Sequence, residues 1–297
     1  MTGGIHPGPQ DHLIDIAGIR VGHAEDEVAR TGVTVILPDR PAVMAVDVRG
    51  GGPGTRETDA LDPSCLITHF HGLVLAGGSV FGLDAAGAVA AWLSARGVGL
   101  ELGARAVPVV PAAILFDLGN GGDKDWGEAP PYRDLAVAAC QAAGADDRIG
   151  PIGAGHGARA GSRPGGIGAA SLIDPARGVR VAALMAVNCF GEVMDGPPGA
   201  DVPLPKAGQL GGNTSIGVVA TDARLDKAAA KRLAMMAQDG LARAIRPIHT
   251  PFDGDSVFAM ATGTAAGDVS ALDLAVIGTL AADCVCRAVQ RAVGQLG

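Results

Sequence analysis

Residues 211–223 read Gly-Gly-Asn-Thr-Ser-Ile-Gly-Val-Val-Ala-Thr-Asp-Ala. The apolar run within them predicts a strand over 215–220, and the Pro- and Gly-rich segment before it, 196–212, predicts a linker. A Thr at such a junction can attack the carbonyl group of the preceding residue if the backbone is bent, and water then splits the ester. The new amine of Thr214 would act as the base for its own hydroxyl. A linker followed by an ordinary strand fits the same residues, so the local sequence leaves both interpretations open.

Working outward from that strand, apolar runs, glycine turns and helical patterns alternate along the chain. The expected strands span 33–37, 43–48, 73–76, 179–187, 215–220 and 257–261, and the expected helices span 84–96, 134–143, 226–245 and 270–293. Residues 99–113 are expected to be extended, and residues 119–131 to form a polar loop. Because strands and helices mix without regular βαβ alternation, the expected fold class is α+β.

Composition excludes several functional classes. The chain has 297 residues, 48% of them hydrophobic, so it can bury a sizeable core. Its formal net charge is −8 without basic runs, which argues against binding nucleic acid or an anionic membrane. Residues 1–10 are polar and no apolar stretch of about 18 residues occurs, so neither a signal peptide nor a membrane span is expected. The five cysteines are scattered, which is typical of the reducing cytoplasm, and we expect a cytoplasmic protein.

A pair of carboxylates near the C-terminus is a second candidate for chemistry. Asp253 and Asp255 flank a glycine just before an expected strand, a spacing that on a strand places both side chains on one face. Two close carboxylates cannot both ionise freely, so one would hold a proton while the other orients an amine or a hydroxyl. Asn188, at the end of another expected strand, could stabilise an oxyanion. A solvated turn and a common strand-end Asn are the alternatives for these residues.

Familiar catalytic and metal-binding motifs do not occur in the sequence. It has no Gly-x-Ser-x-Gly elbow, no Gly-x-x-x-x-Gly-Lys-Ser/Thr loop and no His-Glu-x-x-His. His69 and His71 would share one face of a strand, but a third clustered ligand is not evident. Cys284 and Cys286 would diverge on a helix. We therefore expect no metal and no cofactor, and a phosphate-binding enzyme built on the glycine-rich run 153–158 is a weak alternative.

Together these segments resemble the P1 peptidase family, which contains L-aminopeptidase/D-amidase-esterases, β-peptidyl aminopeptidases and 6-aminohexanoate-oligomer endohydrolases. The resemblance covers nearly the whole chain. The motifs that carry it are IDIAGIRVGH at 14–23, LAGGSVFGLDAAGAV at 75–89, GAGHGARAG at 153–161, NTSIGVVATDA at 213–223 and RPIHTPFDGDSVFA at 246–259. Several long motifs in the right order are far more specific than any one of them.

The resemblance implies an architecture and a processing step. The fold would be a four-layer αββα sandwich, similar to that of N-terminal-nucleophile hydrolases, formed by one domain over 1–297. Self-cleavage between Asn213 and Thr214 would leave an α chain, 1–213, assembled with a β chain, 214–297. The αβ units would form a homo-oligomer, a tetramer.

The resemblance also implies roles for single residues. Thr214 would be the nucleophile, with Asp253 and Asp255 as the acidic pair beside it and Asn188 as the oxyanion residue. The enzyme would be a hydrolase that cleaves an amide or ester bond of a small peptide or aminoacyl substrate through a Thr acyl-enzyme.

One departure from the family pattern concerns the end of the glycine loop. In the nylon-hydrolase branch a catalytic Lys follows this loop, and here Ser162 takes its place with Arg163 next to it. Both are expected to lie at the substrate. An arginine stays charged and cannot shuttle a proton as a desolvated lysine can. The alternative function is therefore an unprocessed, catalytically weak relative that binds a small amine or peptide.

Overall fold

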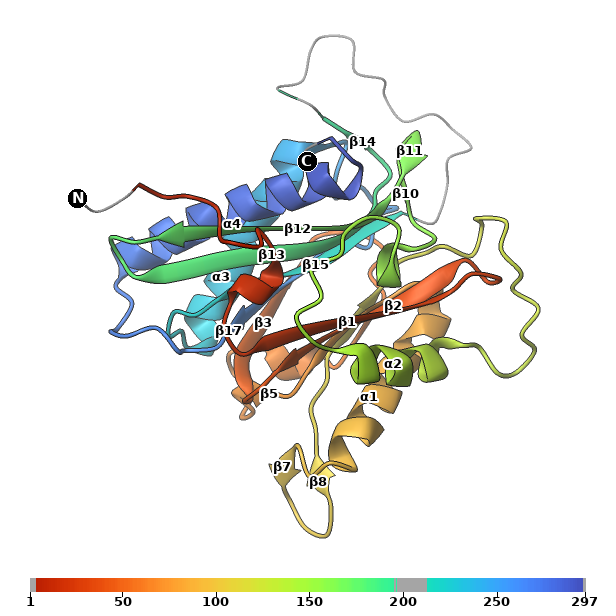
Figure 1. The fold of residues 1–297 in the computed structure, drawn as a ribbon, viewed down its shortest axis with the longest axis horizontal. Helices are drawn as coiled ribbons and strands as arrows, with labels where there is room; N and C mark the ends of the chain where they lie inside the picture. Colours follow the sequence, from red (N-terminus) through yellow and green to blue (C-terminus); the bar gives the residue numbers. More distant parts are fainter. Residues whose placement is uncertain (1–3, 195, 197–212, 296–297) are drawn as a thin grey trace.

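The computed structural model describes residues 4–194, 196 and 213–295. In these residues two β-sheets pack against each other, and two helices cover the outer face of each sheet (Figure 1). The layers are therefore helix, sheet, sheet and helix, which confirms the expected αββα sandwich. The linker predicted over 196–212 lies outside the described residues, apart from Gly196.

The first sheet contains the strand that begins at Thr214. Its strands, in spatial order, are β12 (Gly166–Asp174), β13 (Val179–Asn188), β15 (Thr214–Thr221), β17 (Ser256–Ala261), β3 (Ala42–Val48) and β5 (His69–Phe70). Neighbours are antiparallel except β15 and β17, which run parallel with Ile216 opposite Ser256. Because parallel strands begin at the same edge of a sheet, the loop that leads into β17 lies beside the start of β15.

The second sheet is formed mainly by the first third of the chain. Its strands, in spatial order, are β1 (Ile19–Asp26), β2 (Thr31–Pro38), β6 (Leu73–Ala76), β9 (Ala112–Ile114) and β4 (Thr55–Arg56). Shorter strands pair in two-stranded ladders: β7 (Leu100–Glu101) with β8 (Ala106–Val107), β10 (Arg159–Ala160) with β11 (Arg163–Pro164), and β14 (Glu192–Val193) with β16 (Ile245–Arg246).

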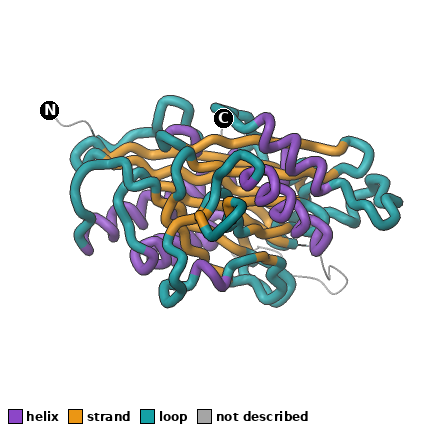
Figure 2. The backbone as a smooth tube through the Cα atoms, turned by 90° about the horizontal axis from the view of Figure 1, so that it is seen from below, coloured by secondary structure: helices purple, strands orange, loops and turns teal. Residues whose placement is uncertain are grey.

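Helices form the two outer layers, and the strands lie between them (Figure 2). The first sheet is covered by α3 (Lys227–Ala244) and α4 (Ala271–Ala292), and the second by α1 (Asp84–Ser94) and α2 (Tyr132–Ala142). Short 3-10 helices span Leu13–Asp15, Asp59–Leu61, Ser79–Leu83 and Gly153–Gly155. None of the helices in the described part of the chain combines the length and hydropathy that a membrane span requires.

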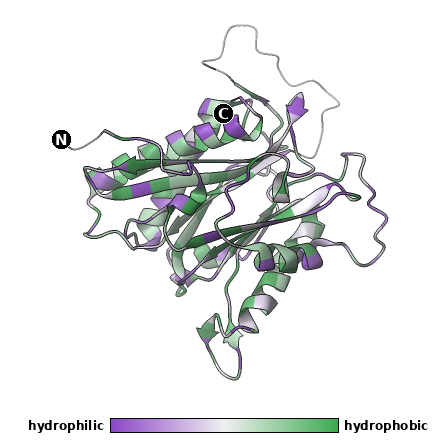
Figure 3. Ribbon diagram, viewed as in Figure 1, coloured by the Kyte–Doolittle hydropathy of each residue, from purple (hydrophilic) through white to green (hydrophobic). Residues whose placement is uncertain are grey.

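Hydrophobic residues fill all three spaces between the four layers. On β15, Val218 packs between the two sheets, whereas its neighbour Val219 packs under α3 and α4. The strands of both sheets are hydrophobic along much of their length, whereas polar residues gather on helix faces and loops (Figure 3). A strand that is buried on both faces has no polar side to present. This explains why the chain shows continuous apolar runs instead of strict alternation.

The expected helices and the expected strands of the first sheet are confirmed with small shifts at their ends. Two long strands, β1 and β12, and several strands of two residues were not predicted. Strand β12 begins in a glycine-dense segment that suggests turns, but a Cβ at Gly168 would lie 1.9 Å from the backbone oxygen of Ala288 in α4. Glycine here permits close packing of the helix on the sheet. The expected extended segment 99–113 is broken into short strands separated by turns.

Candidate active site

Thr214 is the first residue of β15 and is buried, with 5% of its surface exposed. Its Oγ1 donates a hydrogen bond to the carbonyl oxygen of Asn213 over 2.5 Å. That carbonyl group belongs to the peptide bond that is predicted to be cleaved. The hydroxyl therefore lies beside the group that it would attack.

The backbone N–H of Gly254 is directed at the same peptide bond. Its nitrogen lies 3.2 Å from the carbonyl oxygen of Asn213 and 3.2 Å from Oγ1 of Thr214. The parallel pairing of β15 and β17 brings the two segments together, and Asn213 forms a parallel bridge with Asp253 just before both strands. A backbone N–H in this place can stabilise negative charge on a carbonyl oxygen under attack.

Asp253 is fully buried in the loop that leads into β17. Its Oδ2 accepts hydrogen bonds from the backbone N of Thr250 over 2.8 Å and from Thr250 Oγ1 over 2.6 Å, and its Oδ1 accepts one from the N of Phe190 over 3.4 Å. Burial, and next the charge of Asp255, raises the pKa of Asp253 above its usual range. One of the two carboxylates is therefore biased toward its protonated form, as expected.

Asp255 is also fully buried, but its partners are different. Its Oδ1 accepts a hydrogen bond from the backbone N of Ser215 over 2.8 Å. Its Oδ2 accepts from the backbone N of His249 over 3.0 Å and lies 2.9 Å from the ring Nδ1 of His249. Strand β17 begins at Ser256, so both carboxylates lie just before the strand, as the sequence predicts, and the shared strand face does not apply to them. Asp255 is instead tied to the backbone directly after Thr214.

Asn188 ends β13 and lies opposite Thr214 in the antiparallel register of β13 and β15. Its Oδ1 accepts from the backbone N of Arg159 over 2.8 Å, and its Nδ2 donates to the carbonyl oxygen of Phe116 over 3.0 Å. These three residues and Asn213 line a pocket of about 200 Å³. The pocket thus lies beside Asn213, the residue that precedes Thr214.

The sequence profile described as Peptidase family S58 matches residues 11–295 of the chain. The chain belongs to peptidase family S58. This finding confirms the resemblance to the P1 peptidases, and it makes the chain a hydrolase of peptide bonds.

Curated relatives of this S58 peptidase support the assignment along most of the chain. An uncharacterised aminopeptidase of Mycobacterium tuberculosis (strain H37Rv) is 43% identical over 93% of this chain and 92% of its own length. A 6-aminohexanoate-oligomer endohydrolase of Kocuria sp. is 28% identical over 86% of this chain and 76% of its own.

Two solved structures share the fold of this S58 peptidase. A Burkholderia sp. beta-aminopeptidase superimposes with a TM-score of 0.78 at 25% identity, over 98% of this chain and 88% of the other. An L-aminopeptidase D-Ala-esterase/amidase from Ochrobactrum anthropi, described as a variant among the N-terminal-nucleophile hydrolase fold, superimposes with a TM-score of 0.73 at 23% identity, over 98% and 87% of the two chains. The expected fold class is therefore confirmed.

Ser162 of the S58 peptidase lies at the exposed turn between β10 and β11, and the exposed Arg163 begins β11. The N and Oγ of Ser162 donate to the two carboxylate oxygens of Glu192, each over 2.9 Å. In the part of the chain that the structure describes, neither Ser162 nor Arg163 lines the pocket at Asn213. Ser162 is thus bound to Glu192 at this turn.

The two histidines whose spacing could suit a metal, His69 and His71, form hydrogen bonds with protein groups. His69 is exposed at the end of the first sheet, with its Nδ1 2.8 Å from Thr68 Oγ1. His71 is buried, and its Nδ1 accepts a hydrogen bond from the backbone N of Val109 over 3.1 Å. Across residues 4–194 and 213–295, no group of three His, Cys, Asp or Glu side chains is arranged to hold a metal ion.

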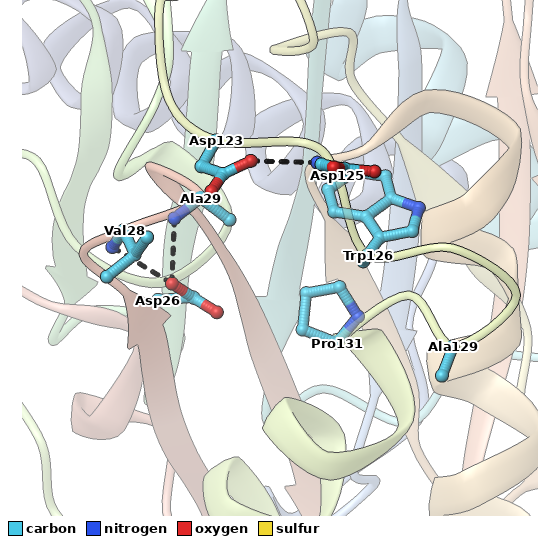
Figure 4. A pocket seen from close by; sticks show the side chains of 8 residues that line it. All are labelled: Asp26, Val28, Ala29, Asp123, Asp125, Trp126, Ala129 and Pro131. Carbon is cyan, nitrogen blue, oxygen red and sulfur yellow. Dashed lines mark hydrogen bonds between the residues drawn. The ribbon is translucent and has the colours of Figure 1, made fainter.

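A second pocket, of about 290 Å³, lies between the β1–β2 turn and the loop over 123–131 (Figure 4). It shares none of its described lining residues with the pocket at Asn213. Two of its carboxylates, Asp26 and Asp123, accept hydrogen bonds from backbone N–H groups two or three residues further along their own turns. These carboxylates therefore stabilise local turns, and we assign no chemistry to this pocket.

Two residues of the site are not identified by sequence reasoning, His249 and Gly254. His249 stands between Pro247 and Pro251, six residues before Asp255. The two prolines restrict the backbone around it, but no feature of this segment indicates that His249 contacts Asp255. Gly254 carries no signal beyond its place between two acidic residues, because its role depends on a backbone N–H.

Proposed function

We propose that this S58 peptidase is a self-processing amidohydrolase or aminopeptidase whose nucleophile is Thr214 at a new N-terminus. The observation that carries the proposal is the position of Oγ1 of Thr214, 2.5 Å from the carbonyl oxygen of Asn213. The N–H of Gly254 faces both oxygens at 3.2 Å. Nucleophile, target carbonyl and a donor for the developing negative charge are thus next to one another.

Self-cleavage would begin with attack of Oγ1 on the carbonyl carbon of Asn213. The N–H of Gly254 would stabilise the oxyanion, and the hydroxyl proton would pass to the leaving nitrogen of Thr214. The C–N bond breaks, and the Asn213 acyl group is then held as an ester on Oγ1. Water hydrolyses this ester, which gives a carboxylate at Asn213 and a free amine and hydroxyl on Thr214.

The same hydroxyl would then act on substrates. The amine of Thr214 takes the hydroxyl proton, directly or through water, and Oγ1 attacks an amide or ester carbonyl. Asn188, which lies opposite Thr214, and backbone N–H groups would hold the oxyanion. Asp255, which is bonded to the N of Ser215, would orient the amine, with Asp253 beside it. Water then releases the acyl group. The proposed substrates are small peptides or aminoacyl amides and esters.

The sheet order explains how the two chains would stay together after cleavage. Strands β15 and β17 would belong to the β chain, 214–297, and they are neighbours in the interior of the first sheet. They are flanked by β13 and β3, which would belong to the α chain, 1–213. Separation would break ladders on both sides and expose the apolar core, so the cut protein would remain one assembly.

Mass measurement of the purified protein under denaturing conditions tests the proposal. Cleavage after residue 213 of 297 leaves a second chain of 84 residues, so the expected masses are about 21 and 8 kDa in proportion to 29.5 kDa. N-terminal sequencing of the small chain should read Thr-Ser-Ile-Gly-Val. Thr214→Ala should stay uncut and inactive, whereas Thr214→Ser should retain part of both reactions.

A single full-length chain in an active preparation would contradict the proposal. A full-length chain with little activity would instead favour an unprocessed relative that binds a small amine or peptide. Light scattering of the same samples tests whether αβ units form the expected tetramer.

A further inference from the structure

His249 contacts the carboxylate of Asp255 through two of its own nitrogen atoms. Its backbone N donates to Oδ2 over 3.0 Å, and its ring Nδ1 lies 2.9 Å from the same oxygen. Asp255 is fully buried, and 17% of the His249 side chain is exposed. Since every backbone partner of this carboxylate is a donor, an Asp255 carboxylate that accepts a hydrogen bond from Nδ1–H satisfies all of these contacts.

The backbone of His249 adopts a conformation that few side chains tolerate. Its φ is +56°, in the left-handed region. Among residues other than glycine, Asn, Asp and His are the ones enriched there. In this conformation both N–H groups of His249 reach one carboxylate oxygen. A disfavoured backbone conformation that persists beside reactive groups points to a functional constraint.

The other oxygen of Asp255 is also held. Its Oδ1 accepts from the backbone N of Ser215, the residue directly after Thr214. A continuous set of hydrogen bonds therefore runs from His249 through Asp255 to the start of β15. The ring Nε2 of His249 is buried and has no hydrogen-bond partner among the described residues. Among the described residues, the ring of His249 therefore makes its hydrogen bond through Nδ1.

We propose that His249 is a positioning residue of this peptidase, which holds the Asp255 carboxylate directed at the start of β15. The inference rests on the function proposed above, because the amine that Asp255 would orient exists only after cleavage before Thr214. Without the ring N–H, the carboxylate loses one of three donors. Only the backbone N–H groups of Ser215 and His249 then hold it, so it turns more freely.

Two substitutions separate this role from a purely structural one. His249→Asn keeps a side-chain N–H donor close to the place of Nδ1, and Asn tolerates the left-handed conformation. His249→Gly tolerates that conformation even better but has no donor. His6 supplies a matched control, because it is exposed and its Nδ1 contacts a backbone oxygen, that of Pro7, over 2.8 Å. His6→Gly should leave the kinetics unchanged.

The test is hydrolysis of an aminoacyl p-nitroanilide by the wild-type protein and the variants, with cleavage before Thr214 checked by N-terminal sequencing. His249→Asn should keep kcat within about 3-fold of the wild type. His249→Gly should lose about 10-fold to 100-fold in kcat with KM nearly unchanged, the scale of one hydrogen bond to a charged group.

Two results would overturn this inference and leave the proposed function intact. One is wild-type kcat in His249→Gly, and the other is a His249→Asn variant as impaired as His249→Gly. A wild-type chain that stays uncut would refute the proposed function itself, and the inference with it. The two failures are therefore distinguished by the state of the wild-type protein.

Discussion

Gly254 and Thr214 meet through a backbone N–H and a hydroxyl, with the Gly254 nitrogen 3.2 Å from Oγ1. A Cβ on Gly254 would lie 2.7 Å from that Oγ1 and 2.9 Å from the backbone oxygen of Gly52. The space that the hydroxyl occupies therefore exists because residue 254 has no side chain. The same contact places the donor against the carbonyl oxygen of Asn213.

Gly254→Ala should slow self-cleavage by at least about 10-fold, because the new methyl group displaces either the hydroxyl or the N–H from the peptide bond. The measurement is the fraction of intact chain over time by mass spectrometry. Gly144→Ala is the control, since the nearest atom to a Cβ there is 3.8 Å away. Equal rates for Gly254→Ala and the wild type would show that this N–H takes no part in the cleavage.

Asp255→Asn should lower kcat by about 10² to 10⁴, the usual scale for a positioned acid or base. The substitution keeps the shape but replaces one acceptor oxygen by an NH₂ group, which would face the donors of Ser215 or His249. Self-cleavage should slow as well, because the same hydroxyl acts in both reactions. Asp39→Asn, in an exposed ion pair with Arg20, is the control. Wild-type rates for Asp255→Asn on an aminoacyl p-nitroanilide would remove Asp255 from the site.

Treatment with EDTA or dipicolinate should leave activity unchanged, since the proposed reaction uses a hydroxyl, an amine and hydrogen-bond donors alone. The measurement is the hydrolysis rate before and after dialysis against the chelator. A loss of activity that zinc restores would contradict this prediction. It would direct attention to His69 and His71, the pair whose spacing suggests a metal site in the sequence.

Acid should destabilise the protein through two buried histidines. Burial lowers the pKa of His12 from 6.5 to about 4, and burial likewise lowers that of His23 to about 4. Between pH 6.5 and 4 the unfolded chain therefore binds more protons than the folded one, so the stability present above pH 6.5 is lost as the pH falls.

His12→Phe should remove part of this acid sensitivity, because neither ring nitrogen of His12 has a hydrogen-bond partner among the described residues. Urea unfolding gives the free energy of unfolding at pH 7 and at pH 4.5. The loss between these two pH values should be about 2 kcal/mol smaller for His12→Phe than for the wild type, at about 1.4 kcal/mol per pH unit. Identical losses for both proteins would show that His12 is accessible to protons in the folded state.

The local sequence accounts for the layers and for the choice of the proposed nucleophile. Strands such as β15 are apolar on both faces because they are buried on both, so their runs predict interior strands of a layered fold. The helices follow from their periodic apolar residues and their caps, such as Asp226, which accepts from the N of Ala229 at the start of α3. The Gly-Gly-Asn-Thr junction suggests a nucleophile from covalent chemistry alone, because a hydroxyl next to a peptide bond is a local arrangement.

Only the tertiary structure decides which groups surround that nucleophile. The contacts of Thr214 and Ser215 with Gly254 and Asp255 join residues about 40 positions apart, and they depend on the parallel register of β15 and β17. A shift of one residue in that register would turn each side chain to the opposite face of the sheet, and no local pattern encodes it. For the same reason the sequence could suggest Ser162 and Arg163 for the site, while the structure ties Ser162 to Glu192 at an exposed turn. Composition and periodicity reflect local preference and burial. The proposed catalytic arrangement depends instead on long-range strand pairing, so only the folded chain reveals that arrangement.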